Sequence, residues 1–350
     1  MRAIIVGYGL AGQVFHAPLL RAAGFEVTAI VARDAQRRAH AAADFPHALL
    51  CDDLTQALSQ SAAELVVLAS PTATHAPLGI EALEAGRHVV IDKPFAVNQA
   101  EADALIEAAQ RAEKLLIPFQ NRRWDADFLT LKTLMDEQKL GPIMRYEARF
   151  DRFNPIVKDR WREHNIEGGG LLYDLGPHLV DQALQLFGAP EWVFCTQLMQ
   201  RDNAQTDDGF ELILGSSRTD YPYVALGASM FSPDGIQAAP RFKVNGRQAT
   251  WLKHGFDPQE TRLRSGVIPT QDDWCSEVDE ARGFLIDGTT GEVSRTAAGI
   301  GQWPVFYKHV RAAMLGEARA PVLATQARWT CAVIDAARES ARNGQRVYLT

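Results

Sequence analysis

The chain contains 350 residues, of which 47% are hydrophobic and 23% are charged, and its formal net charge is −7. This length predicts roughly two domains, each with its own core. The ordinary composition excludes disorder, collagen and coiled coil as the main architecture. The excess of acidic residues argues against a nucleic acid as the main partner, because binding a phosphate backbone needs a broad basic surface.

The sequence also argues against a membrane span and a disulfide framework. It contains no apolar run of about 18 residues, the length that predicts a transmembrane helix. Its first residues are typical of a strand that breaks at Gly7 rather than of a signal peptide. The cysteines form no CxxC pair, which favours buried thiols over disulfides or structural zinc. They are Cys51, Cys195, Cys275 and Cys331. We therefore expect a cytoplasmic protein with reduced cysteines.

The first 120 residues alternate apolar runs with helical patterns. The apolar runs, each typical of a buried strand, are 3–7, 27–32, 64–70, 88–92 and 115–119. The helical patterns between them include 12–23, 75–86 and 100–114. Continuous apolar strands separated by helices are typical of a parallel sheet covered on both faces. Residues 1–120 are therefore predicted to form a doubly wound Rossmann domain of the α/β class.

The pattern changes after residue 120. Helices are predicted over 125–141, after the glycines at 168–170, and over 325–344. Asn245-Gly246 lies between two strand-like runs and predicts a type I′ hairpin, which means antiparallel pairing. Residues 254–280 are polar and aperiodic and predict a long loop. Residues 121–350 are thus predicted to form an α+β domain with a largely antiparallel open sheet.

A glycine-rich motif directly follows the first predicted strand and opens a helix. Its residues, Gly7, Tyr8, Gly9, Leu10, Ala11 and Gly12, fit the pattern GxGxxG. The glycines permit a tight turn and a close approach of the backbone to a pyrophosphate. The helix N-terminus supplies free N–H groups for that anion. We therefore predict that these six residues bind a dinucleotide cofactor.

The end of the second strand indicates which dinucleotide is bound. This strand ends at Ala32, which is followed by Arg33 and Asp34. An acidic residue at the strand end would bind the ribose 2′-hydroxyl of NAD, and residue 32 is not acidic. The guanidinium of Arg33 favours a 2′-phosphate instead. We predict NADP, with contacts from Ala32 and Arg33. NAD stays an alternative, because Asp34 could turn toward the ribose.

Two short signatures predict the chemical site. Asp92-Lys93-Pro94 ends a predicted strand at the carboxyl edge of the sheet, where such sheets bind ligands. Asp174 and His178 are four residues apart and share one helix face, so they could shuttle a proton. The alternatives are a surface lysine, an ordinary helix-surface pair and a metal pair. No third metal ligand stands at a fitting spacing, so no metal is expected.

The order of these motifs resembles the glucose–fructose oxidoreductase and inositol dehydrogenase (Gfo/Idh/MocA) family across essentially the whole chain. The resemblance rests on GYGLAG, ASPTATHAP at 69–77, DKP, and GGGLLYDLGPHLVD at 168–181. Four longer segments resemble its NADP-dependent scyllo-inositol dehydrogenase branch: GYGLAGQVFHAPLL at 7–20, FQNRRWDADFLTLK at 119–132, FDRFNP with the following RWRE at 150–163, and LKHGFDPQE at 252–260. The chain departs from the family at Asp92, where the family usually has glutamate.

The resemblance implies an NADP-binding domain and a second domain that binds substrate and forms a dimer or tetramer through its open sheet. It implies catalytic roles for Lys93, Asp174 and His178. Cofactor contacts are then expected from Ser70, Thr72, His75, Lys93 and Pro94. Arg123 and Trp161 are further candidates for substrate contact, with packing or a structural salt bridge as their alternative.

The resulting hypothesis is hydride transfer between NADP and a secondary alcohol of a cyclic polyol, with scyllo-inositol as the favoured substrate. His178 takes the hydroxyl proton, Asp174 orients the substrate or the imidazole, and Lys93 stabilises the alkoxide. In an alternative, Lys93 is the base. Another sugar or keto-sugar is an alternative substrate, because a fold does not specify its substrate. A non-catalytic NADP-binding sensor is the alternative from a different functional class.

Overall fold

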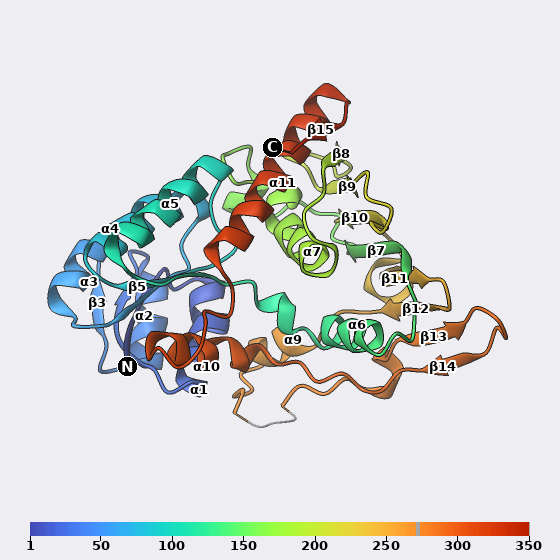
Figure 1. Cartoon of the computed structure of the whole chain (residues 1–350). Coiled ribbons are helices and arrows are strands. Elements are labelled where there is room, and N and C mark those ends of the chain that lie inside the picture. Colours follow the sequence, from blue (N-terminus) through green and yellow to red (C-terminus); the bar gives the residue numbers. More distant parts are fainter. Residues whose placement is uncertain (271–273, 350) are drawn as a thin grey trace. The chain divides into compact units, whose positions relative to one another are not determined.

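The computed structural model describes residues 1–270 and 274–349. The chain divides into two compact units, drawn in sequence colours in Figure 1. The first unit consists of Met1–Asn121, Gln259–Cys275 and Gln302–Arg328, and the second of Arg122–Pro258, Ser276–Gly301 and Trp329–Thr350. All four cysteines are buried. Among the described residues, no helix combines the length and apolar character that crossing a bilayer requires.

A six-stranded sheet forms the centre of the first unit. Its strands, in the order β3-β2-β1-β4-β5-β6, are β3 (Leu49–Cys51), β2 (Glu26–Val31), β1 (Arg2–Val6), β4 (Leu65–Leu68), β5 (His88–Ile91) and β6 (Leu116–Pro118). Neighbouring strands pair in parallel throughout. The central strand β4 is buried at every residue, which explains why it reads as a continuous apolar run. The predicted doubly wound Rossmann sheet is confirmed.

Helices connect these strands and lie around the sheet (Figure 1). They are η1 (Ala11–His16), α1 (Ala17–Ala22), α2 (Ala35–Asp44), α3 (Leu54–Gln60), η2 (Thr72–Thr74), α4 (His75–Glu84) and α5 (Gln99–Ala112), with α9 (Gln259–Arg264) and α10 (Trp303–Met314) from the later segments. Asp34, Asp53 and Asn98 begin α2, α3 and α5. Each side chain accepts the backbone N–H three residues further on, which satisfies a donor that the helix leaves unpaired.

A nine-stranded sheet forms the centre of the second unit. Its strands, in the order β14-β13-β12-β11-β7-β10-β9-β8-β15, are β14 (Val293–Arg295), β13 (Phe284–Asp287), β12 (Ala249–His254), β11 (Pro240–Gly246), β7 (Ile143–Asp151), β10 (Tyr223–Ser229), β9 (Gly209–Gly215), β8 (Trp192–Leu198) and β15 (Val347–Tyr348). The pair β7–β10 is parallel and the remaining pairs are antiparallel. This sheet confirms the predicted α+β class.

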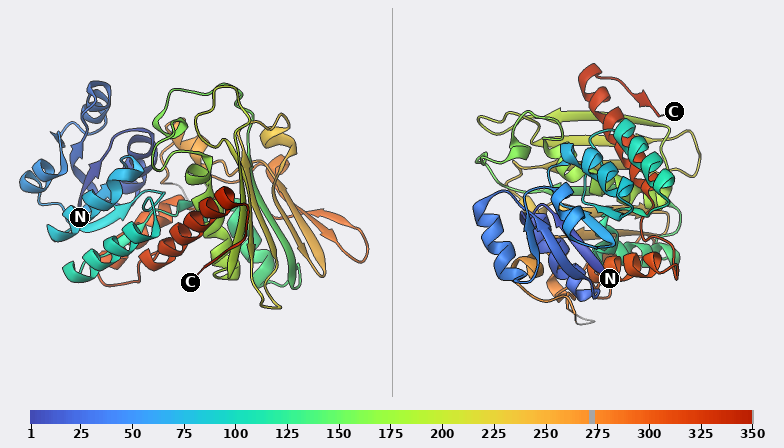
Figure 2. Two further views of the ribbon diagram at one scale, coloured as in Figure 1. Left: turned by 90° about the horizontal axis from the view of Figure 1, so that it is seen from above. Right: turned by 90° about the vertical axis from the view of Figure 1, so that its left-hand side faces the viewer.

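One face of this sheet is covered and the other is open. Helix α7 (Leu171–Phe187) lies along one face, as the left view of Figure 2 shows. Along β7, Tyr146, Ala148 and Phe150 are fully buried, whereas the alternating Arg145 and Glu147 point to the open face. The other helices of the unit are η3 (Asn121–Trp124), α6 (Ala126–Asp136), η4 (Trp161–Glu163), α8 (Gly235–Ala238), η5 (Asp279–Ala281) and α11 (Ala324–Asn343), of which η3 and α11 begin in the first unit.

The hairpin predicted at Asn245-Gly246 exists, but the predicted turn is wrong. Asn245 pairs with Thr250 across β11 and β12, and Gly246 is still in the strand and pairs with Ile143 of β7. Gly246 does not have the positive φ that a type I′ turn requires. Glycine is needed at this position for another reason, since a Cβ there would collide with the carbonyl oxygen of Leu140.

The long loop predicted over 254–280 is partly wrong. Helix α9 occupies Gln259–Arg264, and η5 begins at Asp279. Gln259 is fully buried, and its Oε1 accepts the backbone N–H of Trp303 at 2.7 Å, which joins α9 to the start of α10. This partner is distant in the sequence, so local periodicity did not reveal the helix. Residues 271–273 of the predicted loop lie outside the described residues.

Candidate functional site

The glycine motif packs the turn after β1 tightly against the end of β4. Gly7 has φ +94°, and a Cβ there would lie 2.6 Å from the carbonyl oxygen of Ala69. A Cβ at Gly12 would collide with the carbonyl oxygen of Gly7. Gly9 differs, because the nearest atoms to an added Cβ belong to the Arg37 guanidinium at 3.8 Å. The loop therefore has space above Gly9, and η1 begins with no side-chain cap, which fits a bound pyrophosphate.

Tyr8, the second residue of the motif, points its side chain into the first unit. Its hydroxyl donates to Asp44 Oδ2 at 2.8 Å, and 1% of the residue is exposed. Burial and the adjacent Asp44 carboxylate raise the pKa of Tyr8 well above its usual range. The phenol is therefore a structural donor, and Tyr8 offers only its backbone to a cofactor.

The end of β2 carries a cationic group that the sequence did not reveal. Ala32 is buried, and Arg33 is exposed and donates from Nε to the carbonyl oxygen of Asp52 at 3.1 Å. The Asp34 carboxylate accepts the backbone N–H of Arg37 at 2.9 Å, so it is engaged in capping α2. Arg37 is exposed, and its guanidinium lies over Gly9. The position of Arg37 in the first turn of α2, just after β2, is the sequence signal that could have identified it as a candidate for cofactor contact.

His75 braces two loops at the carboxyl edge of the sheet. It is 1% exposed, with Nδ1 2.8 Å from the carbonyl oxygen of Pro94 and Nε2 2.9 Å from that of Ser70. Burial lowers the pKa of His75, against the opposing attraction of Asp92. The Ser70 hydroxyl lies 2.7 Å from the Thr74 hydroxyl, and Thr72 is buried in η2. The structure thus brings the segments of Ser70 and Pro94 together through a buried side chain.

Lys93 lies two residues after the end of β5, at this same edge. The Asp92 backbone N–H donates to the carbonyl oxygen of Leu68 in β4, which continues the pairing of the sheet by one residue. The Asp92 Oδ1 then accepts the backbone N–H of Lys93 at 2.9 Å. Within the first unit, the ends of β1, β4 and β5 therefore place the glycine loop, Ser70 and Lys93 at one edge, where parallel sheets bind their ligands.

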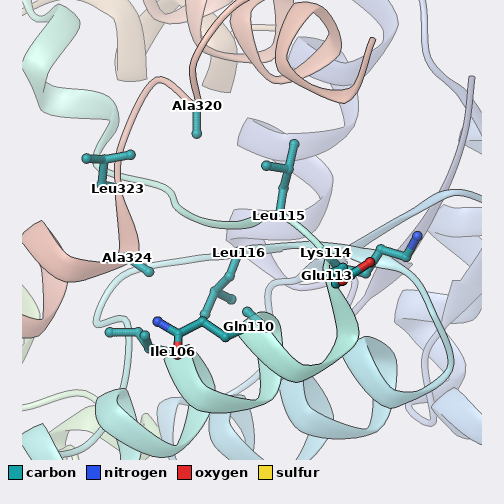
Figure 3. Close-up of a pocket in the computed structure, with 10 residues that line it drawn as sticks. Ile106, Gln110, Glu113, Lys114, Leu115, Leu116, Ala320, Leu323 and Ala324 are labelled. Atoms are coloured by element: carbon teal, nitrogen blue, oxygen red, sulfur yellow. The ribbon is translucent and has the colours of Figure 1, made fainter. Parts of the chain in front are cut away.

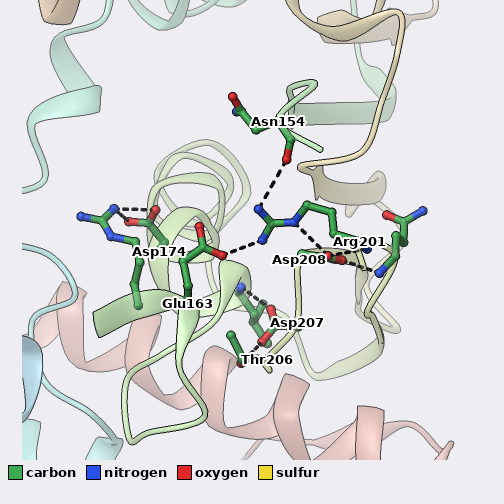
Figure 4. A network of polar contacts seen from close by, with 10 residues as sticks. Asn154, Glu163, Asp174, Arg201, Thr206, Asp207 and Asp208 are labelled. Atoms are coloured by element: carbon green, nitrogen blue, oxygen red, sulfur yellow. Dashed lines mark hydrogen bonds and ion pairs between the residues drawn. The ribbon is translucent and has the colours of Figure 1, made fainter. Parts of the chain in front are cut away.

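In the second unit, Asp174 and His178 lie one turn apart on α7, as predicted. The Arg162 Nη1 donates to both oxygens of Asp174 at 2.8 Å, an ion pair drawn in Figure 4. His178 is 4% exposed, and its ring centroid lies 6.4 Å from that of Phe150. Arg162 was missed, because no local pattern connects residue 162 with residue 174.

Buried ion pairs anchor the segment that carries Arg162. The Arg201 Nη2 donates to Glu163 Oε2 at 2.6 Å and its Nε donates to Asp208 Oδ2 at 3.0 Å. The Arg201 and Asp208 side chains are 3% and 0% exposed (Figure 4). Charges this buried are strongly destabilising when one partner is removed, so the segment is held firmly. Trp161 begins the short helix η4 in this segment and is 36% exposed.

The glycines before α7 serve a tight start of that helix. Gly170 has φ +98°, and a Cβ there would collide with the Asp207 carboxylate. Asp207 accepts the first N–H groups of the helix, from Leu171 to its carbonyl oxygen at 2.9 Å and from Leu172 to Oδ2 at 2.7 Å. Burial raises the pKa of Asp207, although the Leu172 N–H opposes this rise. At Gly170 the backbone therefore lies close to the carboxylate of Asp207.

Replacing Gly170 by alanine is expected to lower the free energy of unfolding by about 3 kcal/mol, because it combines backbone strain with a clash against Asp207. Urea titration followed by circular dichroism measures this change. Gly291→Ala is the matched control, since Gly291 has φ +73° and nothing within 4 Å of an added Cβ. It should cost about 1 kcal/mol. Equal losses in the two variants would show that the clash with Asp207 is unimportant.

Arg123 is held in an internal ion pair. Its Nε and Nη2 donate to the two oxygens of Asp181 at 2.8 and 2.7 Å. The two side chains are 10% and 3% exposed. This bidentate geometry fits the structural salt bridge that was the alternative to substrate contact for this residue.

An apolar groove lies elsewhere in the first unit, between α5 and residues 320–324 (Figure 3). Its lining includes Ile106, Leu115, Leu116 and Leu323. Leu116 begins β6, so the groove lies at the amino-terminal edge of the sheet and away from the glycine loop. None of its lining residues is among the predicted site residues.

Comparisons with known proteins identify relatives over the whole chain. Two models of the Gfo/Idh/MocA oxidoreductase family match the chain. The model of the NAD-binding Rossmann fold matches residues 1–119, and the model of the C-terminal alpha/beta domain matches residues 132–349. The uncharacterised Escherichia coli oxidoreductase YdgJ is 36% identical, covering 98% of this chain and 97% of its own. The Bacillus subtilis scyllo-inositol 2-dehydrogenase (NADP(+)) IolW is 34% identical, covering 99% and 95%. The solved structure of YvaA from Bacillus subtilis superposes with a TM-score of 0.93 at 33% identity, covering 100% and 98%.

Proposed function

Because the chain belongs to the Gfo/Idh/MocA oxidoreductase family and binds a nicotinamide cofactor, we propose that it oxidises scyllo-inositol at a ring carbon with NADP as hydride acceptor. The choice of scyllo-inositol as substrate is supported by the 34% identity to IolW over 99% of this chain. The presence of Lys93, Asp174 and His178 supports the reaction. When bound, the nicotinamide accepts the hydride from the substrate carbon.

Three side chains share the remaining chemistry. His178 takes the proton of the reacting hydroxyl. Its ring is nearly excluded from water, which suits this role. The Lys93 ammonium stabilises the negative charge that develops on the substrate oxygen. Asp174, which is paired with Arg162, accepts hydrogen bonds from the substrate hydroxyls. In the alternative assignment Lys93 takes the proton.

Other residues would position substrate and cofactor. We assign the exposed Trp161 to a polyol ring face and Arg123 to holding Asp181 on α7. The backbone of Gly7–Gly12 holds the pyrophosphate, and Pro94, Ser70 and Thr72 line the nicotinamide side of the cofactor. His75 supports that side from the interior through its contacts with Ser70 and Pro94.

The residues at the end of β2 favour NADP over NAD. Arg33 and Arg37 are exposed there, whereas the Asp34 carboxylate is engaged by the backbone N–H of Arg37. A capping carboxylate is poorly placed to accept a ribose hydroxyl, and two guanidinium groups near the glycine loop suit a 2′-phosphate. The residue contacts therefore favour NADP over NAD.

Arg37→Ala is expected to raise the KM for NADP about 10- to 100-fold, because a charge-assisted hydrogen bond to phosphate contributes about 1.5–3 kcal/mol. The KM for NAD, which lacks the 2′-phosphate, should change less than about threefold. Steady-state kinetics with each cofactor measure both values. Arg111→Ala, at an exposed arginine on α5, is the control. An equal loss with NAD and NADP would contradict the role of Arg37.

A substrate panel tests the proposed reaction. Inositol isomers, aldoses and keto-sugars are assayed for reduction of NADP or oxidation of NADPH. We expect scyllo-inositol to have a kcat/KM at least about tenfold above any aldose, the discrimination that a hydrogen-bonding site readily provides. Rapid oxidation of an aldose with scyllo-inositol inert would assign a sugar substrate instead. NADPH binding without turnover of any compound would favour the sensor.

We also propose that the open face of the nine-stranded sheet joins copies of this chain in a dimer or tetramer. That face carries Tyr223, which is 43% exposed and pairs with Arg145 of β7. Apolar side chains on an otherwise uncovered sheet face are typical of interfaces. Sedimentation of Tyr223→Glu against the native chain tests the proposal, and an unchanged oligomer would contradict it.

A further inference from the structure

A completely buried histidine of the first unit faces Asp92. His16 ends η1, is 0% exposed, and its ring centroid lies 4.3 Å from that of Phe119. Its Nδ1 lies 2.7 Å from the hydroxyl oxygen of Tyr307. Its Nε2 lies 3.7 Å from Asp92 Oδ1 and has no hydrogen-bond partner among the described residues. A buried polar nitrogen in this position is costly unless it serves the nearby carboxylate.

Tyr307 is the hydrogen-bond partner of the His16 Nδ1 atom. Tyr307 is 0% exposed, and burial together with the Asp92 charge raises its pKa well above its usual range. The phenol therefore keeps its proton and can donate it to Nδ1, an arrangement that leaves the ring proton of His16 on Nε2. Nε2 is the atom that faces Asp92. The His16 ring thus presents an N–H group to that carboxylate.

Asp92 connects this histidine to Lys93. The same Oδ1 that faces His16 accepts the backbone N–H of Lys93 at 2.9 Å. We propose that His16 is a positioning residue for Lys93, acting through Asp92, with Tyr307 holding the imidazole in the required tautomer. The three groups come from η1, from the end of β5 and from α10, so only the folded unit assembles them. The inference rests on the role that the proposed function gives to Lys93.

The groups around Asp92 explain why it needs this partner. Its carboxylate faces His16 of η1, Lys93 in the segment after β5, His75 of α4 and Tyr307 of α10. Burial alone would raise the pKa of Asp92, but the attraction of His16 first, and then of Lys93 and His75, holds it below its usual range. Without His16, the largest opposing contribution is lost while burial remains. Asp92 then takes up a proton at a higher pH, and its oxygen accepts the Lys93 N–H less strongly.

Two conservative variants separate the two nitrogens of the ring. His16→Gln keeps an amide donor near the position of Nε2, which faces Asp92, whereas His16→Asn keeps an amide oxygen near Nδ1 that can accept from Tyr307. We expect His16→Asn to lower kcat about tenfold or more and His16→Gln to lower it less than about threefold, as for other groups that orient an active-site residue. Thr28→Val is the control, because it removes the contact of Thr28 with Ser61 at 2.8 Å in the same unit.

A double-mutant cycle then tests the route through Asp92. If His16 acts through that carboxylate, His16→Asn lowers kcat strongly in the native background and has little further effect beside Asp92→Asn. If the loss of kcat in the double variant equalled the product of the losses in the two single variants, the proposal would be overturned, because His16 and Asp92 would then act independently.

The pH titration of the Lys93 amide provides a readout that needs no activity. In protein labelled with 15N-lysine, the Lys93 signal is identified by its loss in Lys93→Met, and its shift follows the ionisation of Asp92. We expect the titration to move to higher pH in His16→Asn and to stay near its native position in His16→Gln. Identical titrations in all three proteins would overturn the proposal. An inert scyllo-inositol with the expected amide titrations would refute the proposed substrate and leave the positioning role supported.

Discussion

Lys93→Met is expected to lower kcat about 10²- to 10³-fold with scyllo-inositol, the usual loss when a donor to a developing oxyanion is removed. Methionine keeps the length and the apolar stem of lysine, and the backbone N–H that Asp92 accepts is retained. The KM for NADP should change little, because the proposed cofactor contacts are made by the glycine loop and the arginines after β2. NADPH absorbance in steady-state assays gives kcat and KM together.

The control for this variant is Lys308→Met, which removes a charge from an exposed position on α10 in the same unit. It should change kcat less than about twofold. If Lys93→Met lost less than about tenfold, the charge of Lys93 would not be essential in the transition state. The chemical step would then be assigned to the groups on α7 alone.

His178→Ala is expected to lower kcat about 10²- to 10⁴-fold, the range that proton transfer by a positioned side chain contributes. The ring is 4% exposed, so its removal leaves a cavity that can hold a small imidazole. Added imidazole should therefore restore part of the activity, which a purely structural role would not explain. Activity close to native across the pH range would contradict the assignment and favour Lys93 as the base.

The fold of the first unit was largely predictable because its sheet is buried on both faces. The continuous apolar runs at β1, β2, β4 and β5 correspond to real strands. The strand β3 was missed, and only one of its three residues, Cys51, is buried, whereas all three residues of the equally short β6 are buried. Residues 302–328 belong to the first unit through contacts of Trp303 and Tyr307 that no local pattern in the sequence encodes.

The candidate site was predictable where local spacing determines geometry. The four-residue interval between Asp174 and His178 places both on one turn of α7, and the glycine motif follows β1 directly. The groups that hold these residues were missed. Arg162 pairs with Asp174, and Tyr307 contacts His16 from a position 291 residues away. Such partners are chosen by tertiary packing, so neither periodicity nor residue type reveals them.

Transfer of deuterium from a labelled substrate tests the central claim most directly. scyllo-Inositol carrying deuterium on its ring carbons is incubated with the native chain and NADP, and the NADPH formed is analysed by mass spectrometry. The account predicts NADPH that carries one deuterium, formed in equal amount with the ketone product, because the substrate carbon donates the hydride directly. NADPH without deuterium, or no NADPH formed while the cofactor binds, would contradict it.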